Sequence, residues 1–262
     1  MKKSEKISIG ICVFLILLCA FGAFFAPNDP QKVDLLGKLQ GPSSQYPFGT
    51  DAMGRCVLSR VLYGGRTTLV IVLFSSILIL LTGLPIGLLM GSARKKTSLL
   101  GESLLNAATA LPPIAYLIVF MGAWGSGALT TMVAIAASLF LRVIKLAKSK
   151  TELEYAKAYI LCATAAGASR LRLLFIHILP NILRDIILFL CLSCAEMIMM
   201  ITSFSFMGLG LGDDTIDWGT MILDAQKVAY KRPDMIFYPI AVMFLCTLAF
   251  NILGQEKRAQ HS

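Results

Sequence analysis

Apolar runs of about 20 residues recur along this chain, and they constrain its fold more than any other feature. A helix needs a run of that length to cross the hydrocarbon core of a membrane. Six runs occur, at residues 7–26, 69–91, 99–123, 129–146, 182–207 and 235–253. The chain is 56% hydrophobic and 15% charged, whereas soluble domains carry about 25% charged residues. The sequence therefore predicts an all-α polytopic membrane protein with six transmembrane helices, in a single domain over residues 1–262.

Two of these runs need further comment. Glu102, Asn106 and the pair Pro112-Pro113 interrupt the third run, so we expect a kinked helix whose freed backbone groups find partners inside the bundle. The first run follows Lys2 and could pass for a cleaved signal peptide. It is long for that role, and its removal would put the new N-terminus outside. We therefore expect it to remain as the first helix.

The basic residues predict the orientation. With the N-terminus inside and the helices alternating, 16 of the 24 Lys and Arg residues fall on the inner side. Arg142 is counted among them. This is the cytoplasmic excess that the positive-inside rule predicts. We expect both termini in the cytoplasm, an extracytoplasmic loop at about residues 27–65 and a cytoplasmic segment at about residues 143–180. The net charge of +9 then reflects topology in a lipid bilayer, not nucleic-acid binding.

The chemistry-bearing residues indicate neither catalysis nor a cofactor. Six of the seven cysteines fall in apolar runs or on the inner side, and Cys56 has no outer partner, so no disulfide framework is expected. Cys191 and Cys194 lack the further ligands that a metal needs, so we expect apolar packing and no metal site. The sequence holds no Gly-x4-Gly-Lys-Ser/Thr phosphate-binding loop. Energy from ATP would have to come from another subunit.

Residues 155–169, YAKAYILCATAAGAS, form an ordered pattern on the predicted inner side. The run 156–166 is rich in helix-forming residues, and Gly167 can take the left-handed conformation that closes a helix. Ser169 can cap a second helix. That helix is expected to end or kink at Pro180. Its predicted apolar stripe is Leu171, Leu174, Phe175 and Ile178. The pattern predicts a helix, a sharp turn and a helix along the membrane surface.

The order of features in residues 155–181 resembles the cytoplasmic signature of binding-protein-dependent ABC importer permeases. In that family the short helix docks into a groove of the ATPase subunit and transmits its movement. The resemblance implies a coupling role for Tyr155, Tyr159, Ile160, Cys162, Ala163, Gly167, Ala168 and Ser169. The signature has two consecutive alanines where this chain has Cys162 and Ala163, so Cys162 is a departure from it. The glutamate of the signature falls on Leu161, so a charged contact to the ATPase would be missing.

Three further stretches resemble the second permease subunit of peptide and nickel importers. Residues 48–67 read FGTDAMGRCVLSRVLYGGRT, residues 205–210 read SFMGLG and are followed by DWGTM at 217–221, and residues 250–254 read FNILG. Cys56 stands where the family has aspartate, and residues 213–215 and 255–257 also depart from its pattern. The resemblance implies a bacterial cytoplasmic (inner) membrane location. It also implies three kinds of partner: a second homologous permease, two ABC ATPase subunits and an extracytoplasmic solute-binding protein.

Glu196 is the one acid deep inside the fifth apolar run, where an ionisable residue is costly and normally functional. With Met200 and Ser203 it is the candidate for the translocation path, contacting a cationic or metal-chelate substrate. The alternative is a structural ion pair with a basic residue of the second permease. Within the family, the residues near Glu196 and after Trp218 resemble the nickel type. They favour nickel or a nickel chelate, with di- or oligopeptides as the alternative.

Two other classes of protein were weighed. An intramembrane enzyme would need a nucleophile with a base, or a metal constellation, within the spans. The only histidines, His177 and His261, both fall on the cytoplasmic side of the predicted topology. A homo-oligomeric channel would need a filter sequence or a repeat of pore-lining polar residues, and the sequence holds none.

Overall fold

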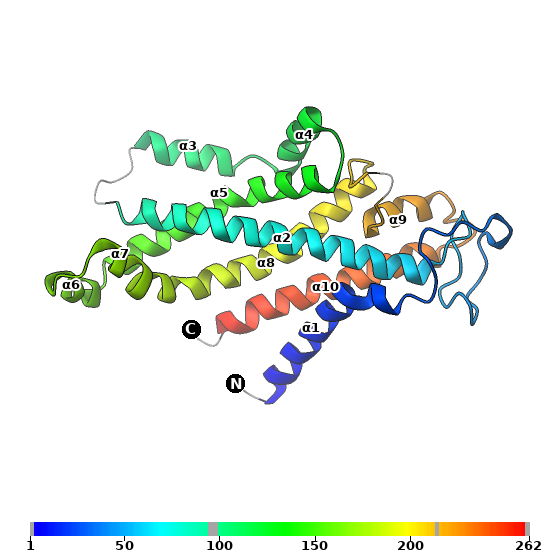
Figure 1. Cartoon of the computed structure of the whole chain (residues 1–262), viewed down its shortest axis with the longest axis horizontal. Helices are drawn as coiled ribbons and strands as arrows, with labels where there is room; N and C mark the ends of the chain where they lie inside the picture. Colours follow the sequence, from blue (N-terminus) through cyan, green and yellow to red (C-terminus); the bar gives the residue numbers. More distant parts are fainter. Residues whose placement is uncertain (1–2, 94–98, 213–214, 260–262) are drawn as a thin grey trace.

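The computed structural model describes residues 3–93, 99–212 and 215–259, and over these ranges the regular structure is helical with no strand. The long helices lie side by side in a bundle (Figure 1). The elements are α1 (Lys3–Phe21), η1 (Gly22–Phe25), η2 (Leu35–Gly37), α2 (Val57–Gly91), α3 (Leu99–Thr109), α4 (Pro113–Trp124), α5 (Ala128–Tyr155), α6 (Ala158–Ala165), α7 (Arg170–Arg172), the π-helix η3 (Leu173–Ile178), α8 (Leu179–Phe206), α9 (Trp218–Gln226) and α10 (Asp234–Ala259). Several residues of the topology and sequence arguments lie outside the described residues: Lys2, Arg94, Lys95, Lys96, Asp213, Asp214 and His261.

Four stretches of the described chain are helical, long and apolar enough to cross a membrane: Val57–Gly91, Ala128–Tyr155, Arg170–Phe206 and Asp234–Gln255. Two shorter apolar helices, Val13–Phe25 and Pro113–Trp124, accompany them. The all-α membrane fold predicted from the sequence is thus confirmed. The count of six spans stays a prediction, because the helices of the first and third runs are not among these four stretches.

The helix ends differ from those predicted from hydropathy. α2 begins at Val57, so its first turns take up residues assigned to the outer loop at 27–65. α5 runs on to Tyr155, so residues 143–155 of the predicted inner segment are helical. Hydropathy identifies the residues that suit the hydrocarbon core of a membrane, whereas a helix can continue past the edge of that core. With 35 residues, α2 is roughly 52 Å long, well over a hydrocarbon core of about 30 Å.

The third apolar run forms two helices instead of the single kinked helix expected over 99–123. α3 ends at Thr109 and α4 starts at Pro113, with Pro112 in an extended conformation at ψ 145°. Two consecutive prolines remove two N–H donors and disfavour helix before them. The Tyr116 hydroxyl donates to the carbonyl of Ala108 over 2.9 Å, which ties α4 back to the end of α3.

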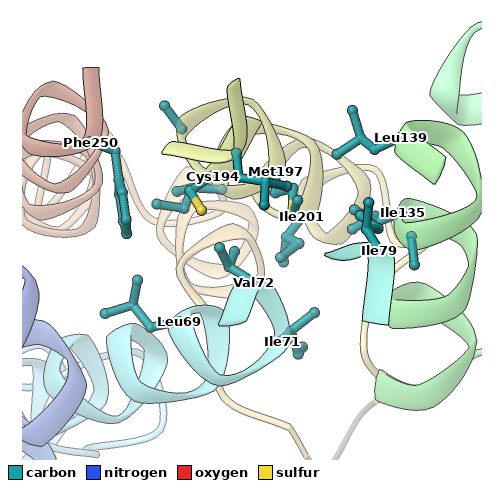
Figure 2. Packing of buried hydrophobic residues seen from close by; sticks show 14 of the residues in the cluster. Leu69, Ile71, Val72, Ile79, Ile135, Leu139, Cys194, Met197, Ile201 and Phe250 are labelled. Carbon is teal, nitrogen blue, oxygen red and sulfur yellow. The ribbon is translucent and has the colours of Figure 1, made fainter. Parts of the chain in front are cut away.

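The core of the bundle lies between α2, α5 and α8. Figure 2 shows Val72 and Ile79 of α2 facing Ile135 of α5 and Met197 of α8, and all four side chains are buried. α2 and α5 form the most extensive helix pair. Small residues let transmembrane helices approach closely, and a glycine stripe on α2 does so here. A methyl group on Gly87 would lie 2.5 Å from Cβ of Ala147 and 2.7 Å from the carbonyl oxygen of Ile144.

The two ends of the bundle carry different elements. The first described residues of α1, the end of α10 and the short helix α6 lie at one end, whereas the loop between η1 and α2 lies at the other, with α9 (Figure 1). This grouping agrees with the alternation assumed in the sequence analysis.

Candidate functional site

The short helix α6 and the turn that follows it have the geometry predicted from residues 155–169. The N–H of Gly167 donates to the carbonyl of Thr164, and the N–H of Ala168 to that of Ala163, both over 3.0 Å. These two bonds make a Schellman motif, which requires a left-handed residue at its turn. Gly167 supplies it with φ +83°. Ser169 then accepts from the N–H of Arg172 over 3.4 Å and caps the next helix, as expected.

The sequence predicted that the second short helix would end or kink at Pro180, and the structure excludes an end at this residue. α7, η3 and α8 run on without interruption through Pro180. The π-helical turn at Leu173–Ile178 lies shortly before Pro180. Proline interrupts the regular hydrogen bonds of an α-helix, and a π-turn accommodates such an interruption without ending the helix. The wide turn also rotates the helix face. Leu174 and Ile178 are buried as expected, but Leu171 and Phe175 are exposed, and Leu173 is buried in their place.

Tyr159 ties α6 to the helices on either side of it. Its hydroxyl donates to Oε1 of Glu154, near the end of α5, over 2.7 Å. It accepts from Nδ2 of Asn181, in α8, over 3.0 Å. Desolvation, followed by the hydrogen bond to Glu154, raises the pKa of Tyr159 to about 12, so the hydroxyl stays protonated at physiological pH. Tyr159 therefore joins α6 to both α5 and α8 by hydrogen bonds.

The remaining predicted coupling residues, on α6 and beside it, divide into buried and exposed groups. Ile160 is buried, and Tyr155, Ala163 and Ala168 are half-buried. Cys162 is exposed, and Leu161 has 65% of its surface accessible. A cavity of about 690 Å³ adjoins α6, the end of α2 and the end of α5. An exposed apolar face on a firmly held helix is suited to bind another protein.

Glu196 has a partner within the chain. Nη1 of Arg142, on α5, donates to its Oε1 over 2.9 Å. The Arg142 side chain is 33% exposed and that of Glu196 is 42% exposed. Met200 is half-buried and Ser203 exposed, four and seven residues further along α8, so the three candidate path residues share one helix face. From the sequence, Arg142 counts with the inner residues and not with the helix facing Glu196, so a basic partner was expected only in a second permease.

At the opposite end, two of the quoted sequence motifs pack against each other. Trp218 is fully buried and donates from Nε1 to the carbonyl of Val61 over 3.0 Å. Gly64 and Gly65 leave room for its ring, since a methyl group on Gly65 would lie 3.0 Å from Cζ2. Asp217 caps α9 by accepting from the N–H of Gly219 over 2.7 Å. Its burial raises the pKa of that carboxyl group, against the opposing effect of these hydrogen bonds.

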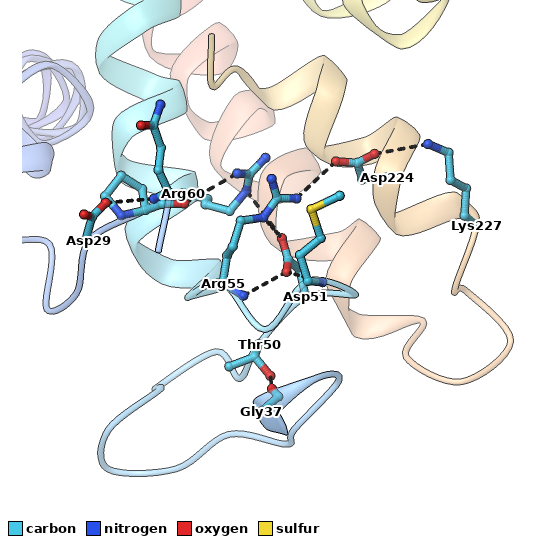
Figure 3. Close-up of polar contacts among 11 residues, drawn as sticks. Asp29, Gly37, Thr50, Asp51, Arg55, Arg60, Asp224 and Lys227 are labelled. Atoms are coloured by element: carbon cyan, nitrogen blue, oxygen red, sulfur yellow. Dashed lines mark hydrogen bonds and ion pairs between the residues drawn. The ribbon is translucent and has the colours of Figure 1, made fainter. Parts of the chain in front are cut away.

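The loop before α2 is held by a network centred on Asp51. Oδ1 of Asp51 accepts from the N–H groups of Met53 and Arg55 over 2.8 and 2.9 Å. Oδ2 accepts from Nε of Arg55 over 2.6 Å, and Nη2 of Arg55 reaches Asp224 of α9 over 3.4 Å. Figure 3 shows the Arg60 guanidinium beside that of Arg55. Sequence reasoning quoted these residues only as a motif, since nothing local indicates that α9 completes the network.

Comparisons with known proteins agree with this architecture. Residues 83–255 match the family model described as "Binding-protein-dependent transport system inner membrane component". The di/tripeptide transport system permease protein DppC of Pseudomonas aeruginosa (strain UCBPP-PA14) is 31% identical, with 97% of this chain and 87% of that protein covered. The nickel transport system permease protein NikC of Escherichia coli (strain K12) is 28% identical, with 97% and 92% covered.

A solved structure supports the fold independently. A chain of the MetNI methionine ABC transporter, from inward-facing conformations in the CY5 native crystal form, superposes with a TM-score of 0.62 at 16% identity. The match covers 76% of this chain and 95% of that one. From the family match over residues 83–255 and the extent of its similarity to DppC, the chain belongs to the binding-protein-dependent transport system inner membrane component family.

Proposed function

We propose that this chain is a permease subunit of an ATP-driven importer and forms the translocation path with a second, homologous permease. The observation that carries the proposal is α6. Its exposed apolar face, with Leu161 and Cys162, is held by the Gly167 turn and by Tyr159. An ATPase subunit docked on this face would move α5 and α8 together, because Tyr159 links α6 to both helices.

The same proposal sets the sidedness and the partners. α6, the start of α1 and the end of α10 would lie in the cytoplasm of a bacterial cell, where two ABC ATPase subunits bind. The loop before α2 and α9 would lie outside, where an extracytoplasmic solute-binding protein delivers the solute. The excess of basic residues on the α6 side of the predicted topology supports this orientation.

For the substrate we propose a di- or oligopeptide. Arg142 places a fixed positive charge 2.9 Å from Glu196, where a bare nickel dication would have to pass. A zwitterionic peptide instead offers a carboxylate for the arginine and an ammonium group for the glutamate. This pair also offsets the charge of Glu196, which the sequence suggested as a contact for a cationic or metal-chelate substrate. Nickel or a nickel chelate remains the second candidate, because the Glu196 side chain is 42% exposed and shares its helix face with the Met200 thioether.

Two substitutions of Gly167 test the coupling role, and uptake by the parent protein tests the substrate. Nothing lies within 4 Å of a methyl group built on Gly167, so a substitution there acts through the backbone conformation. Gly167→Pro fixes φ near −65° and should abolish both uptake and substrate-stimulated ATP hydrolysis. Gly167→Asn should retain most of both activities, because asparagine tolerates the left-handed region.

Uptake is measured in a strain that lacks other importers and expresses the complete transporter, with labelled dipeptide and radioactive nickel in parallel. We expect dipeptide uptake by the parent protein. Normal coupling in Gly167→Pro would refute the role of α6. Nickel uptake without dipeptide uptake would leave the permease role intact and overturn the proposed substrate.

A further inference from the structure

The end of the molecule opposite α6 holds an open cavity of about 440 Å³, in the size range of small-molecule sites. Among the residues that the structure describes, three basic residues and one acid line it: Arg55, Arg60 and Lys227, with Asp224. The described wall is otherwise built of small, polar or aliphatic residues, among them Thr215 and glycines of the loop after α8. The charge of this lining favours an anion.

Arg60 differs from an ordinary basic surface residue because its charge is buried in the wall of the cavity. Its side chain is only 7% exposed. Its polar contacts in the described chain are long: 3.5 Å from Nη1 to the carbonyl of Pro30, and 3.7 Å from Nε to Oδ2 of Asp51. A guanidinium group carries five N–H donors, so most of its hydrogen-bonding capacity is not used by these contacts. Burying a charge is costly unless it is paired closely.

The neighbouring acids are already engaged with other groups. Asp51 accepts two backbone N–H groups through Oδ1 and the closer Nε of Arg55 through Oδ2. Asp224 lies 3.2 Å from Nζ of Lys227 and 3.4 Å from Nη2 of Arg55. The guanidinium groups of Arg55 and Arg60 therefore share the carboxylate of Asp51, which already accepts other hydrogen bonds (Figure 3). Both arginines line the cavity.

We propose that this cavity binds a carboxylate group of the incoming solute, with Arg60 as its main contact, before the solute enters the translocation path. The inference rests on the proposed importer function and adds a recognition site for one chemical group. Guanidinium and carboxylate form short, bidentate, charge-assisted hydrogen bonds, which Arg60 has the free donors to make. A peptide C-terminus and a carboxylate chelator carrying nickel both supply this group.

The test compares solutes that carry a free carboxylate with solutes that lack one. Uptake by the complete transporter is measured for dialanine and for dialanine amide, in the parent protein and in Arg60→Gln. Nickel citrate and free nickel ion form a second pair of probes. We expect Arg60→Gln to lower the parent's preference for the free carboxylate by about tenfold, as the loss of one charge-assisted hydrogen bond predicts. Arg60→Lys should retain part of the preference.

Arg232→Gln is the matched control. Arg232 also fastens the outer loop, through the carbonyls of Leu39, Gln40 and Phe48, but it does not line the cavity. If Arg60 only holds the loop, the two glutamine variants should behave alike and reduce both members of each pair equally, and that result would overturn the inference. An equal loss for both solutes, restored by raising the concentration of the solute-binding protein, would assign the cavity to protein docking and also overturn it.

The substrate proposal and this inference fail in different ways. Dependence on Arg60 seen only with nickel citrate would uphold the carboxylate site and reject the peptide as substrate. Uptake of free nickel ion alone, unaffected by Arg60→Gln, would reject both.

Discussion

At the scale of single residues, the proposed function depends most on the pair Arg142–Glu196 and the hydroxyl of Tyr159. The charges of the pair lie 2.9 Å apart between two apolar helices, and neither side chain is fully buried. A charge left alone at membrane depth is costly, so each residue makes the other tolerable. The pair also presents both signs of charge to whatever lies beside α8.

A double-mutant cycle measures how strongly the two charges depend on each other. Glu196→Gln and Arg142→Gln should each destabilise the transporter, since each leaves one charge without its partner. The double variant should be more stable than the sum of the two effects predicts, with a coupling of about 0.5–3 kcal/mol. Thermal unfolding of the purified complex gives these values. Simple additivity would mean that Glu196 finds its main partner elsewhere, for example in the second permease.

Tyr159→Phe removes the hydroxyl that links α5, α6 and α8. The loss of these hydrogen bonds should cost about 1 kcal/mol and weaken the ATPase stimulation by substrate. The pKa of Tyr159 is raised to about 12 from its ordinary 10.0. The stability that this hydroxyl contributes is therefore fully present below pH 10, and it declines only as the pH rises from 10 towards 12. The difference in the free energy of unfolding between the parent protein and Tyr159→Phe should be constant from neutral pH to about pH 9. A difference that vanishes within that range would contradict the assigned hydrogen bond.

At the scale of helices, close packing of α2 on α5 organises the bundle. The glycines Gly83, Gly87 and Gly91 recur every four residues on the face of α2 towards α5. A methyl group on Gly91 would lie 2.6 Å from the carbonyl oxygen of Lys148. Because backbone atoms on α5 are what such a methyl group would meet, side-chain adjustment cannot relieve the clash.

Two glycine-to-alanine substitutions with opposite expected signs test this packing. Gly87→Ala should separate α2 from α5 and destabilise the protein by about 1–3 kcal/mol, the usual range for overpacking. Gly122→Ala, in α4, meets nothing within 4 Å and should stabilise its helix by about 0.5–1 kcal/mol. Thermal unfolding of both variants in detergent checks the comparison. Equal effects would show that the glycine stripe is not a close interface.

At the scale of the whole molecule, the sequence predicted those features that depend on local residues. Apolar runs located the membrane helices, and Gly167 and Ser169 placed the turn after α6, because a left-handed residue and a helix cap have local signatures. The break between α3 and α4 was expected only as a kink, since the degree of bending depends on the helices that surround it. Periodicity also could not reveal the π-helical turn before Pro180, which changed the buried face.

Contacts between distant parts of the chain were not predictable in the same way. Arg142 and Glu196 are 54 residues apart, and Arg55 and Asp224 are 169 apart. Arg142, Arg55 and Asp224 taken alone each resemble an ordinary loop or inner charge, and Glu196 stands out only as an acid in an apolar run. The fold brings them together only after α2, α5, α8 and α9 have packed, so a single sequence gives no signal for the pairing.

The central claim is that α6 is the cytoplasmic docking element, and labelling of Cys162 tests it most directly. Cys162 is exposed on α6, whereas Cys19, Cys56, Cys194 and Cys246 are buried. A membrane-impermeant maleimide is applied to inside-out vesicles and to intact cells, and peptide mapping identifies the label at Cys162. We predict labelling in inside-out vesicles that lack the ATPase subunits, and protection when the complete transporter is assembled. Labelling of Cys162 from outside intact cells, or undiminished labelling in the assembled transporter, would contradict the account.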